Sequence, residues 1–405
     1  MKKIIYYSLL LACAALYSCE KEFAPLVSLG LDDEYILPRM KTLYFQPELR
    51  GKAYLWTMKT KDGRDSVLTQ QKDYIFIESE PGTYHLNFTI VDPETPVNQD
   101  ITIYVVEEQV SYSPYIASVY EYRPAPGQFV NKMPEYLSGD TAESMRRKAE
   151  ESIRGDVRNG VSLGGFGGYA TFGFDHSVMN IEGERDFYIE GNAFYGAAVG
   201  DGVGGSSEPG IILVSFDENQ NGKPDDTWYE IDWHPEYTRQ IVQFGYTLTY
   251  HRPDPNKIPE PGMGAITDKT YIRWTDNLGK EGYVMRNVYH KQDYFPGWLK
   301  GDKLEYVGTR LPNNAYDISG NGTYFVQYVF PKGAYVDHYP NEALDDDGEN
   351  RSHFDIDWAV DIKTRERVHL KAIDFIRVYT AQNQYCGWLG ETSTEIYLAR
   401  DLHIR

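Results

Sequence analysis

Cysteine is scarce in this sequence. Its 405 residues include only Cys13, Cys19 and Cys386. The first two fall in an N-terminal segment that is predicted below to be processed and anchored, so the rest of the chain carries Cys386 alone. The folded part therefore has no intrachain disulfide to stabilise it. Cys386 has no spacing signature of a redox or metal site, and we expect it to be a small buried apolar residue rather than a nucleophile.

Long apolar runs are also missing, apart from one near the start of the chain. Ile4 to Leu16 follows Lys2 and Lys3 and is too short to span a bilayer, a pattern typical of an export signal. It ends in Leu16-Tyr17-Ser18-Cys19, which resembles a bacterial lipobox with Cys19 as the lipidated first residue. A plain secretory peptide with a cysteine near its end is the alternative. Glu20-Lys21-Glu22 is similar to the acidic tag by which Bacteroidetes send lipoproteins to the outer face of the outer membrane.

These features predict a signal peptide over residues 1–18, then the lipidated cysteine and an acidic export tag over residues 19–22. The protein is then expected at the cell surface, attached to the outer membrane through its lipid anchor only.

Basic residues are fewer than acidic residues in this sequence. There are 40 Lys and Arg residues against 60 Asp and Glu residues, so the net charge is −20 and the isoelectric point is about 4.9. The basic surface of a nucleic-acid-binding protein is therefore not expected. Catalytic signatures are missing as well, since the sequence has neither a G-x-S-x-G nor an H-E-x-x-H motif. We expect a binding protein and not an enzyme.

What the sequence has in abundance is tyrosine, glycine and proline, with 34, 36 and 21 residues respectively. Many turns and many aromatic residues favour an all-β protein. Residues 23–109 are predicted to form an Ig/PKD-like β-sandwich with Trp56 in its core. Apolar residues alternate there at Tyr84, Leu86, Phe88 and Ile90, which is the period of a half-buried strand.

A proline- and tyrosine-rich connector over residues 110–139 leads to a larger domain over residues 140–405. One helix is expected at its start, with a capping box from Asp140 to Glu143 and a stop at Gly155. About ten strands are expected after it, including Phe354–Val360, where apolar and acidic residues alternate. So many strands with a single helix predict a jelly-roll β-sandwich.

The segment Val161–Glu230 carries the two most informative loops. Gly164 to Gly168 is glycine-rich, but a strand follows it where a phosphate-binding loop needs a helix, so we expect a tight turn with close backbone approach. Downstream, oxygen side chains at the first, third and fifth places and glycine at the sixth match the opening of a calcium loop. Trp228 stands where a bidentate Glu belongs, so a simple hairpin loop is the alternative. The predicted structural Ca²⁺ ligands are Asp217, Asn219, Asn221, Asp225 and Asp226.

Two aromatic loops indicate where a small ligand could bind. Large rings stand beside glycine or proline there, where a loop can present them for stacking on a flat ligand. Core packing is the alternative for each ring. The candidate ligand-binding residues are Tyr294, Phe295, Trp298, Tyr385 and Trp388 for the rings, with Asn313 and Asn314 for polar contacts.

A family resemblance adds a function to this outline. The stretches VSLGGFGGYATFGFDHSVMN, GNAF, SEPGIILVSFDENQNGKPDDTWYEI, YIRWTDN, GTRLPNN, FDIDWAVD and YCGWLGETSTEI resemble the PKD-containing "cell surface protein" lipoproteins of gut Bacteroidetes. The pattern is also similar to calcium-assisted galactose-binding-type jelly rolls. The resemblance implies capture of vitamin B12 or another cobamide and its delivery to a TonB-dependent transporter. A glycan-binding module and a structural adhesin of the same fold are the alternatives.

Overall fold

The structure is a computed structural model, and it describes residues 28–91, 96–196, 204–387 and 389–404. Its contacts divide the chain into two compact units. The first ends at Val106, except that Pro38–Lys41 and Ile77–Ser79 belong to the second unit together with Glu107–Arg405. None of the helices in the described ranges combines the length and the apolar character that a membrane span requires. Cys19 lies outside these ranges.

The first unit is a small β-sandwich. Its main sheet has the order β1-β7-β6-β3-β4, and a second sheet pairs β2 with β5. The predicted alternation holds, because Leu86, Phe88 and Ile90 are buried in the core around Trp56. The Trp56 ring lies 4.6 Å from that of Phe88, centroid to centroid, and its indole N–H donates to Lys72 O at 3.0 Å. The strands are β1 (Glu34–Pro38), β2 (Leu43–Phe45), β3 (Tyr54–Lys59), β4 (Asp65–Thr69), β5 (Tyr74–Phe76), β6 (Gly82–Ile90) and β7 (Val97–Val106).

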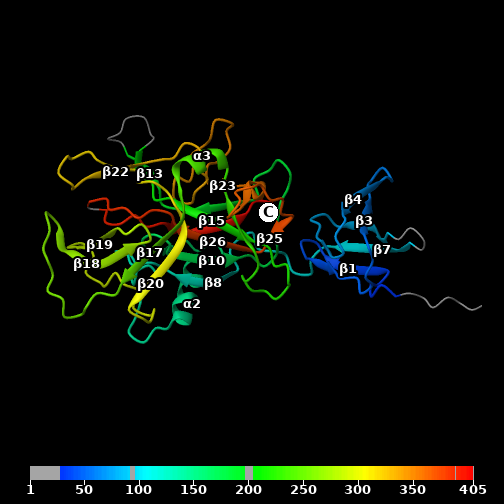
Figure 1. The fold of residues 1–405 in the computed structure, drawn as a ribbon, viewed down its shortest axis with the longest axis horizontal. Coiled ribbons are helices and arrows are strands. Elements are labelled where there is room, and N and C mark those ends of the chain that lie inside the picture. Colours follow the sequence, from blue (N-terminus) through cyan, green and yellow to red (C-terminus); the bar gives the residue numbers. More distant parts are fainter. Residues whose placement is uncertain (1–27, 92–95, 197–203, 388, 405) are drawn as a thin grey trace, which may run out of the picture. The chain divides into compact units, whose positions relative to one another are not determined.

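The second, larger unit is built around a six-stranded antiparallel sheet of order β24-β16-β15-β26-β10-β8 (Figure 1). Its strands are β8 (Ser118–Arg123), β10 (Tyr169–Gly173), β15 (Gly210–Ser215), β16 (Trp228–Ile231), β24 (Ala359–Asp361) and β26 (Phe375–Thr380).

Smaller sheets cover this central sheet or extend from it. Three strands form the order β23-β12-β28, from β12 (Phe187–Glu190), β23 (His353–Phe354) and β28 (Leu398–Asp401). Two pairs join β9 (Val161–Ser162) to β27 (Glu395–Ile396) and β11 (Val178–Met179) to β25 (Ala372–Ile373). Four strands form the order β13-β14-β22-β21, from β13 (Phe194–Tyr195), β14 (Gly204–Ser206), β21 (Ala315–Asp317) and β22 (Phe325–Tyr328).

The main core lies on one face of the six-stranded sheet. Along β15, Ile212 and Val214 point into it, whereas Ile211 belongs to a second cluster on the opposite face. Phe187 and Phe354 from the β23-β12-β28 sheet close the main core from the other side. This arrangement confirms the predicted all-β, β-sandwich class.

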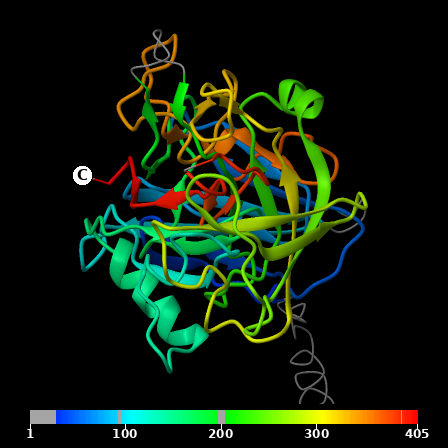
Figure 2. The ribbon, with the colours of Figure 1, turned by 90° about the vertical axis from the view of Figure 1, so that its left-hand side faces the viewer.

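The described residues form two α-helices rather than one. In α2 (Ala142–Ile153), Met145, Ala149 and Ile153 are buried, and this helix packs on β8. The capping box lies one residue later than predicted: Thr141 is the N-cap and exchanges hydrogen bonds with Ser144. The unpredicted helix α3 (Pro235–Ile241) starts at a proline, whose fixed φ suits the first helical turn. The two helices lie on opposite sides of the larger unit (Figures 1 and 2).

The predicted strand at Phe354–Val360 is wrong. Phe354 ends β23, Ile356–Trp358 form the short 3₁₀ helix η2, and β24 begins only at Ala359. The reason is local, because the Asp355 side chain accepts a hydrogen bond from Asp357 N at 2.8 Å and so starts a 3₁₀ turn. Side-chain caps of this kind compete with the strand ladder.

The glycine-rich turn before β10 has the predicted close approach. Gly164 has φ +68°, and a Cβ on it would stand 1.9 Å from Ala125 O. A Cβ on Gly168 would meet Leu163 O at the same distance. No residue with a side chain fits at either position.

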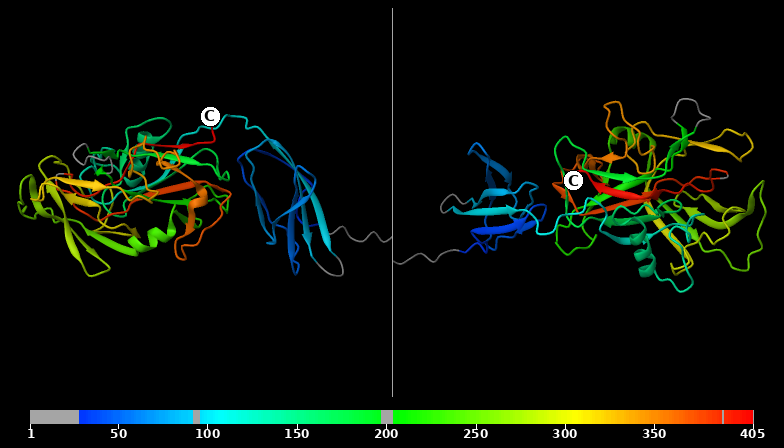
Figure 3. Two further views of the ribbon diagram at one scale, coloured as in Figure 1. Left: turned by 90° about the horizontal axis from the view of Figure 1, so that it is seen from above. Right: turned by 180° about the vertical axis from the view of Figure 1, so that it is seen from behind.

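A second four-stranded sheet, of order β19-β18-β17-β20, borders two surface cavities of the larger unit. It comprises β17 (Gln243–His251), β18 (Ile266–Asp276), β19 (Glu281–Asn287) and β20 (Lys303–Arg310). The β18–β19 hairpin projects at one extreme of this unit (Figures 1 and 3). The hairpin turn lies beyond the Thr275–Glu281 pair, and the Ile266–Asn287 pair is at the opposite end.

Candidate functional site

A cavity of about 290 Å³ lies near the turn end of the β18–β19 hairpin. The hairpin supplies one wall, and the segments after β20 and β26 supply the other. Because four separate stretches of chain meet there, with Tyr246 of β17 as the fourth, the cavity depends on the folded sheet. It is lined by Tyr246, Trp274, Asp276, Lys280, Tyr283, Val284, Arg310, Asn313, Asn383, Gln384, Tyr385 and Glu391. We call it the turn-end cavity.

Aromatic rings give this cavity its apolar surface. Tyr246 is buried, whereas Trp274 and Tyr385 are half-buried and Tyr283 is exposed. The indole of Trp274 lies flat against its partner strand: a Cβ on Gly282 would stand 2.4 Å from the ring. Gly282 therefore leaves the room that the Trp274 ring occupies.

Polar groups stand beside these rings in a connected set. Tyr246 OH donates to Asp276 Oδ2 at 3.0 Å and accepts from Asn383 Nδ2 at 3.4 Å. The Arg310 guanidinium lies 5.0 Å from the centre of the Tyr246 ring, and its Nη2 donates to Asn313 Oδ1 at 3.2 Å. These contacts hold the side chains in place around the cavity.

Two residues of the cavity lining each have a buried polar atom without a hydrogen-bond partner among the described residues. The atoms are Arg310 Nε and Glu391 Oε2. The other oxygen of Glu391 accepts from Gln128 N at 2.6 Å. Because buried polar atoms are normally paired, an unpaired donor and an unpaired acceptor on two residues of one cavity lining point to a polar ligand.

Burial also sets the protonation of Glu391. The side chain is 7% exposed, and burial raises its pKa to about 8. Glu391 is therefore mainly a neutral acid at pH 7. In that form Oε2 can donate a hydrogen bond as well as accept one.

The structure divides the predicted ligand-binding residues. Asn313 and Tyr385 line the turn-end cavity, whereas Asn314 is buried beside it, and its amide donates to Ser207 O and Tyr328 O. Tyr294 and Trp298 are buried in the core at 0% and 5% exposure.

The loop at Tyr294 and Trp298 therefore does not present its rings to a ligand, which corrects the sequence-based expectation. Trp298 packs with Tyr122 and Tyr136, each at 5.8 Å between ring centroids. Phe295 is 3% exposed and borders a different cavity. Trp388 lies outside the described residues.

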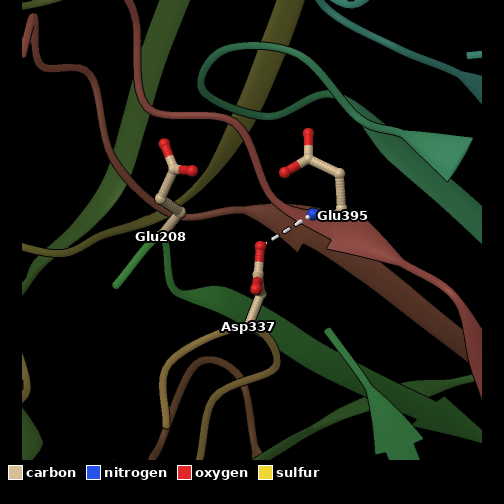
Figure 4. Close-up of side chains that lie close together, drawn as sticks. All are labelled: Glu208, Asp337 and Glu395. Carbon is tan, nitrogen blue, oxygen red and sulfur yellow. Dashed lines mark hydrogen bonds between the residues drawn. The ribbon is translucent and has the colours of Figure 1, made fainter. Parts of the chain in front are cut away.

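A separate cluster of three carboxyl groups, two of them buried and that of Glu208 half-buried, lies where three segments of the chain meet. Glu208 precedes β15, Asp337 follows the segment bridged to Gly210, and Glu395 begins β27. One oxygen from each lies within 4.8 Å of the others, and the three groups face a common space (Figure 4). We call this the carboxylate triad.

Main-chain and hydroxyl donors hold the triad. Asp337 accepts from Asn192 N at 2.6 Å and from Glu395 N at 3.0 Å. Ser393 donates through its N–H to Glu208 at 3.1 Å and through its hydroxyl to Glu395 at 2.8 Å. A Cβ on Gly191 would stand 2.6 Å from Asp337 Cα, so glycine is required beside Asp337.

The triad is strongly perturbed electrostatically. Burial raises the pKa of Asp337 to about 7. Burial first, and the charge of Asp337 second, raise the pKa of Glu395 to about 8. Burial and the charge of Glu395 raise the pKa of Glu208 well above its ordinary value. In the described chain, no lysine or arginine figures among the main influences on these groups.

Such a set can be stabilised by protons or by a cation. Three carboxylates form a hard oxygen donor set, which suits Ca²⁺ better than a soft metal. No local sequence pattern predicts the triad, because its members are far apart along the chain. Glu208 and Glu395 do fall in the SEPG and ETSTEI stretches that carry the family resemblance.

The predicted calcium loop between β15 and β16 does gather its oxygen side chains. Asp217 accepts from Asn221 N at 3.1 Å and from Gly222 N at 2.9 Å, which curls the loop around this carboxylate. Asn219 donates to both Asp225 and Asp226, at 3.1 and 3.0 Å. Asp217 N in turn donates to Asp374 at 2.7 Å, which ties the loop to the sheet. These residues could also hold a cation.

Comparison with known proteins adds little to this geometry. No family model matches the sequence, and no curated protein matches it. Among solved structures, the chain is similar to one from a study titled "Structural basis for the promiscuous specificity of the carbohydrate-binding modules from the beta-sandwich super family". The two are 8% identical over 90% of this chain and 92% of the other, with a TM-score of 0.15. A TM-score this low has no bearing on function.

Proposed function

We propose that the larger unit binds carbohydrate in the turn-end cavity and that the protein does so at the cell surface. The observation that carries the proposal is a cavity lined by aromatic rings and by two residues with unpartnered buried polar atoms, Arg310 (Nε) and Glu391 (Oε2). The proposal is of a binding function and not of catalysis.

A carbohydrate suits both the aromatic rings and the polar groups of this lining. A sugar ring has an apolar C–H face that can lie on Trp274 or Tyr385, and hydroxyls that can both donate and accept. Sugar hydroxyls can accept from an arginine N–H such as that of Arg310 and can pair with a carboxyl group such as that of Glu391. The exposed amide of Asn313 offers a further polar contact at the rim.

The same geometry favours carbohydrate over a cobamide. The cobamide reading depended on rings presented by both aromatic loops, and Tyr294 and Trp298 are in the core. A cavity of about 290 Å³ suits a sugar unit but not a corrin macrocycle with its nucleotide arm. Delivery to a TonB-dependent transporter stays a prediction from the resemblance.

The proposal also includes a lipid anchor and structural Ca²⁺. The lipobox-like sequence before Cys19 supports a lipid anchor in the outer membrane. Structural Ca²⁺ has two candidate locations, the carboxylate triad and the loop of Asp217. Both lie in the larger unit, so either would support the fold that holds the turn-end cavity.

The test is a glycan panel titrated with the soluble chain that starts after Cys19, with cyanocobalamin in parallel. Wild type should bind at least one neutral glycan, and Tyr385→Ala should weaken that binding by about tenfold because a stacking ring is lost. Tyr316→Ala is the matched control, since Tyr316 is an exposed ring outside the cavity. Binding of cyanocobalamin without any glycan, or equal binding by the Tyr385 variant, would reject the proposal.

A further inference from the structure

A second and larger cavity, of about 720 Å³, lies at the other end of the β18–β19 hairpin. Tyr271, Arg286 and Phe295 line it together with the segment after β17, which begins with Arg252. Trp274 and Tyr283 line the turn-end cavity and do not reach this one. We call it the base-end cavity.

Arg252 is fixed in this cavity by neutral partners. Its guanidinium lies 4.2 Å from the centre of the Phe295 ring. Nε donates to Gly301 O at 2.9 Å, and Nη2 donates to Leu299 O. Arg252 makes no ion pair with any residue in the described ranges, so its positive charge is held in place without being neutralised.

Arg286 repeats this arrangement on β19. Its guanidinium lies 5.0 Å from the centre of the Tyr271 ring, and Nη2 donates to two main-chain carbonyls, Lys291 O and Gln292 O. The nearest carboxylate is that of Asp293, 3.9 Å away and on a side chain that is 78% exposed. An exposed pair at this distance contributes little.

Besides Arg252 and Arg286, the charged residues of the lining are Asp254, Lys257, Asp268, Lys291 and Asp293. Lys257 is neutralised by Asp268, whose two oxygens lie 2.8 and 2.7 Å from Nζ. Lys291, also in the lining, forms no ion pair within the described part of the chain. The lining therefore has four basic side chains against three acidic ones, a small positive excess in a protein whose net charge is −20.

We propose that the base-end cavity is a second binding site, for a small anionic ligand that carries a carboxylate or a phosphate group. Arg252 and Arg286 bind the oxygens through the N–H groups that the main chain does not use. Fixed guanidinium groups suit such oxyanions because their N–H donors are arranged in a plane. Phe295 and Tyr271 lie beneath the two arginines and hold them in position. This inference does not depend on carbohydrate binding in the turn-end cavity.

The experiment titrates the soluble chain with D-glucuronate, D-glucose 6-phosphate and, as the neutral probe, D-glucose. Binding is followed by calorimetry and by NMR. At least one anion should bind, and D-glucose should bind more weakly. Arg252→Gln and Arg286→Gln should each weaken anion binding by about tenfold or more, because a charge-assisted hydrogen bond is lost. Added salt should weaken it as well.

Lys269→Gln is the matched control, since it removes the same charge from a residue of β18 that does not line the cavity. Melting temperatures establish that all three variants are folded. A preference for the carboxylate or for the phosphate identifies the source of the oxyanion. Equal binding of D-glucose, equal loss in the Lys269 variant, or no anion binding at millimolar concentration would each overturn the proposal.

Discussion

Replacing Glu391 with glutamine should change the stability of the larger unit in a way that depends on pH. Burial raises the pKa of Glu391 from 4.5 to about 8. The folded state therefore holds the proton more tightly than the unfolded state does. The stabilisation is complete below pH 4.5 and is lost as the pH rises toward 8.

The magnitude follows from this window. Between pH 5 and pH 8, each rise of one pH unit lowers the free energy of unfolding of the wild type by about 1.4 kcal/mol. Over this range the loss is about 4 kcal/mol. Glutamine has the shape of the neutral acid, and its Oε1 can still accept from Gln128 N. The variant should therefore match the wild type at pH 5 and be the more stable protein at pH 8.

Differential scanning calorimetry of both proteins measures this effect. The advantage of Glu391→Gln at pH 8 should reach about 8 °C in the melting temperature of the larger unit. Glu208, Asp337 and Glu395 titrate in both proteins, but the charge of Glu391 adds to the raised pKa of Glu208 and Glu395 in the wild type only. A difference between variant and wild type that is the same at pH 5 and pH 8 would refute the reasoning, because Glu391 would then not be a buried acid with a raised pKa.

Three other predictions follow from the anchor, the candidate calcium sites and the core. Chelation should lower the melting temperature, since Ca²⁺ at a hundredfold excess over its Kd adds about 2.7 kcal/mol to the free energy of unfolding. The effect of the chelator should disappear in Asp337→Asn if the ion binds in the triad, and in Asp217→Ala if it binds in the loop. An unchanged melt would exclude structural calcium. Cys19→Ala should release the protein from the membrane fraction, and protease should degrade the wild type on intact cells; survival there contradicts a surface location. Trp298→Ala should destabilise the larger unit by about 3–5 kcal/mol without changing carbohydrate affinity. A loss of affinity without a loss of stability would instead mean that Trp298 contacts the ligand.

Local patterns predicted the strands well where one face of a strand is buried and the other is not. The alternation through Leu86, Phe88 and Ile90 became β6, and the run around Ile211 became β15. The same rule failed after Phe354, because a periodic sequence does not reveal that Asp355 will cap a 3₁₀ turn. A single side-chain hydrogen bond outweighed the alternation there.

The candidate sites were harder to predict, for a different reason. Composition identified rings beside glycine or proline, but it could not distinguish Tyr385, which lines a cavity, from Trp298, which packs in the core. That difference depends on which elements cover each loop. The carboxylate triad could not be predicted from spacing, because tertiary contacts alone bring Glu208, Asp337 and Glu395 together.

The β18–β19 hairpin makes the two cavities inseparable in one respect. Its side chains line both cavities: Trp274 and Tyr283 line the turn-end cavity, and Tyr271 and Arg286 line the base-end cavity. A one-residue insertion inside either strand would slip the register and turn every following side chain to the opposite face. One genetic event could thus remove both sites together, whereas a change of length in the turn around Leu278 would affect only the turn-end cavity, which Asp276 and Lys280 line. Insertions and deletions among related chains should accordingly avoid the two strands.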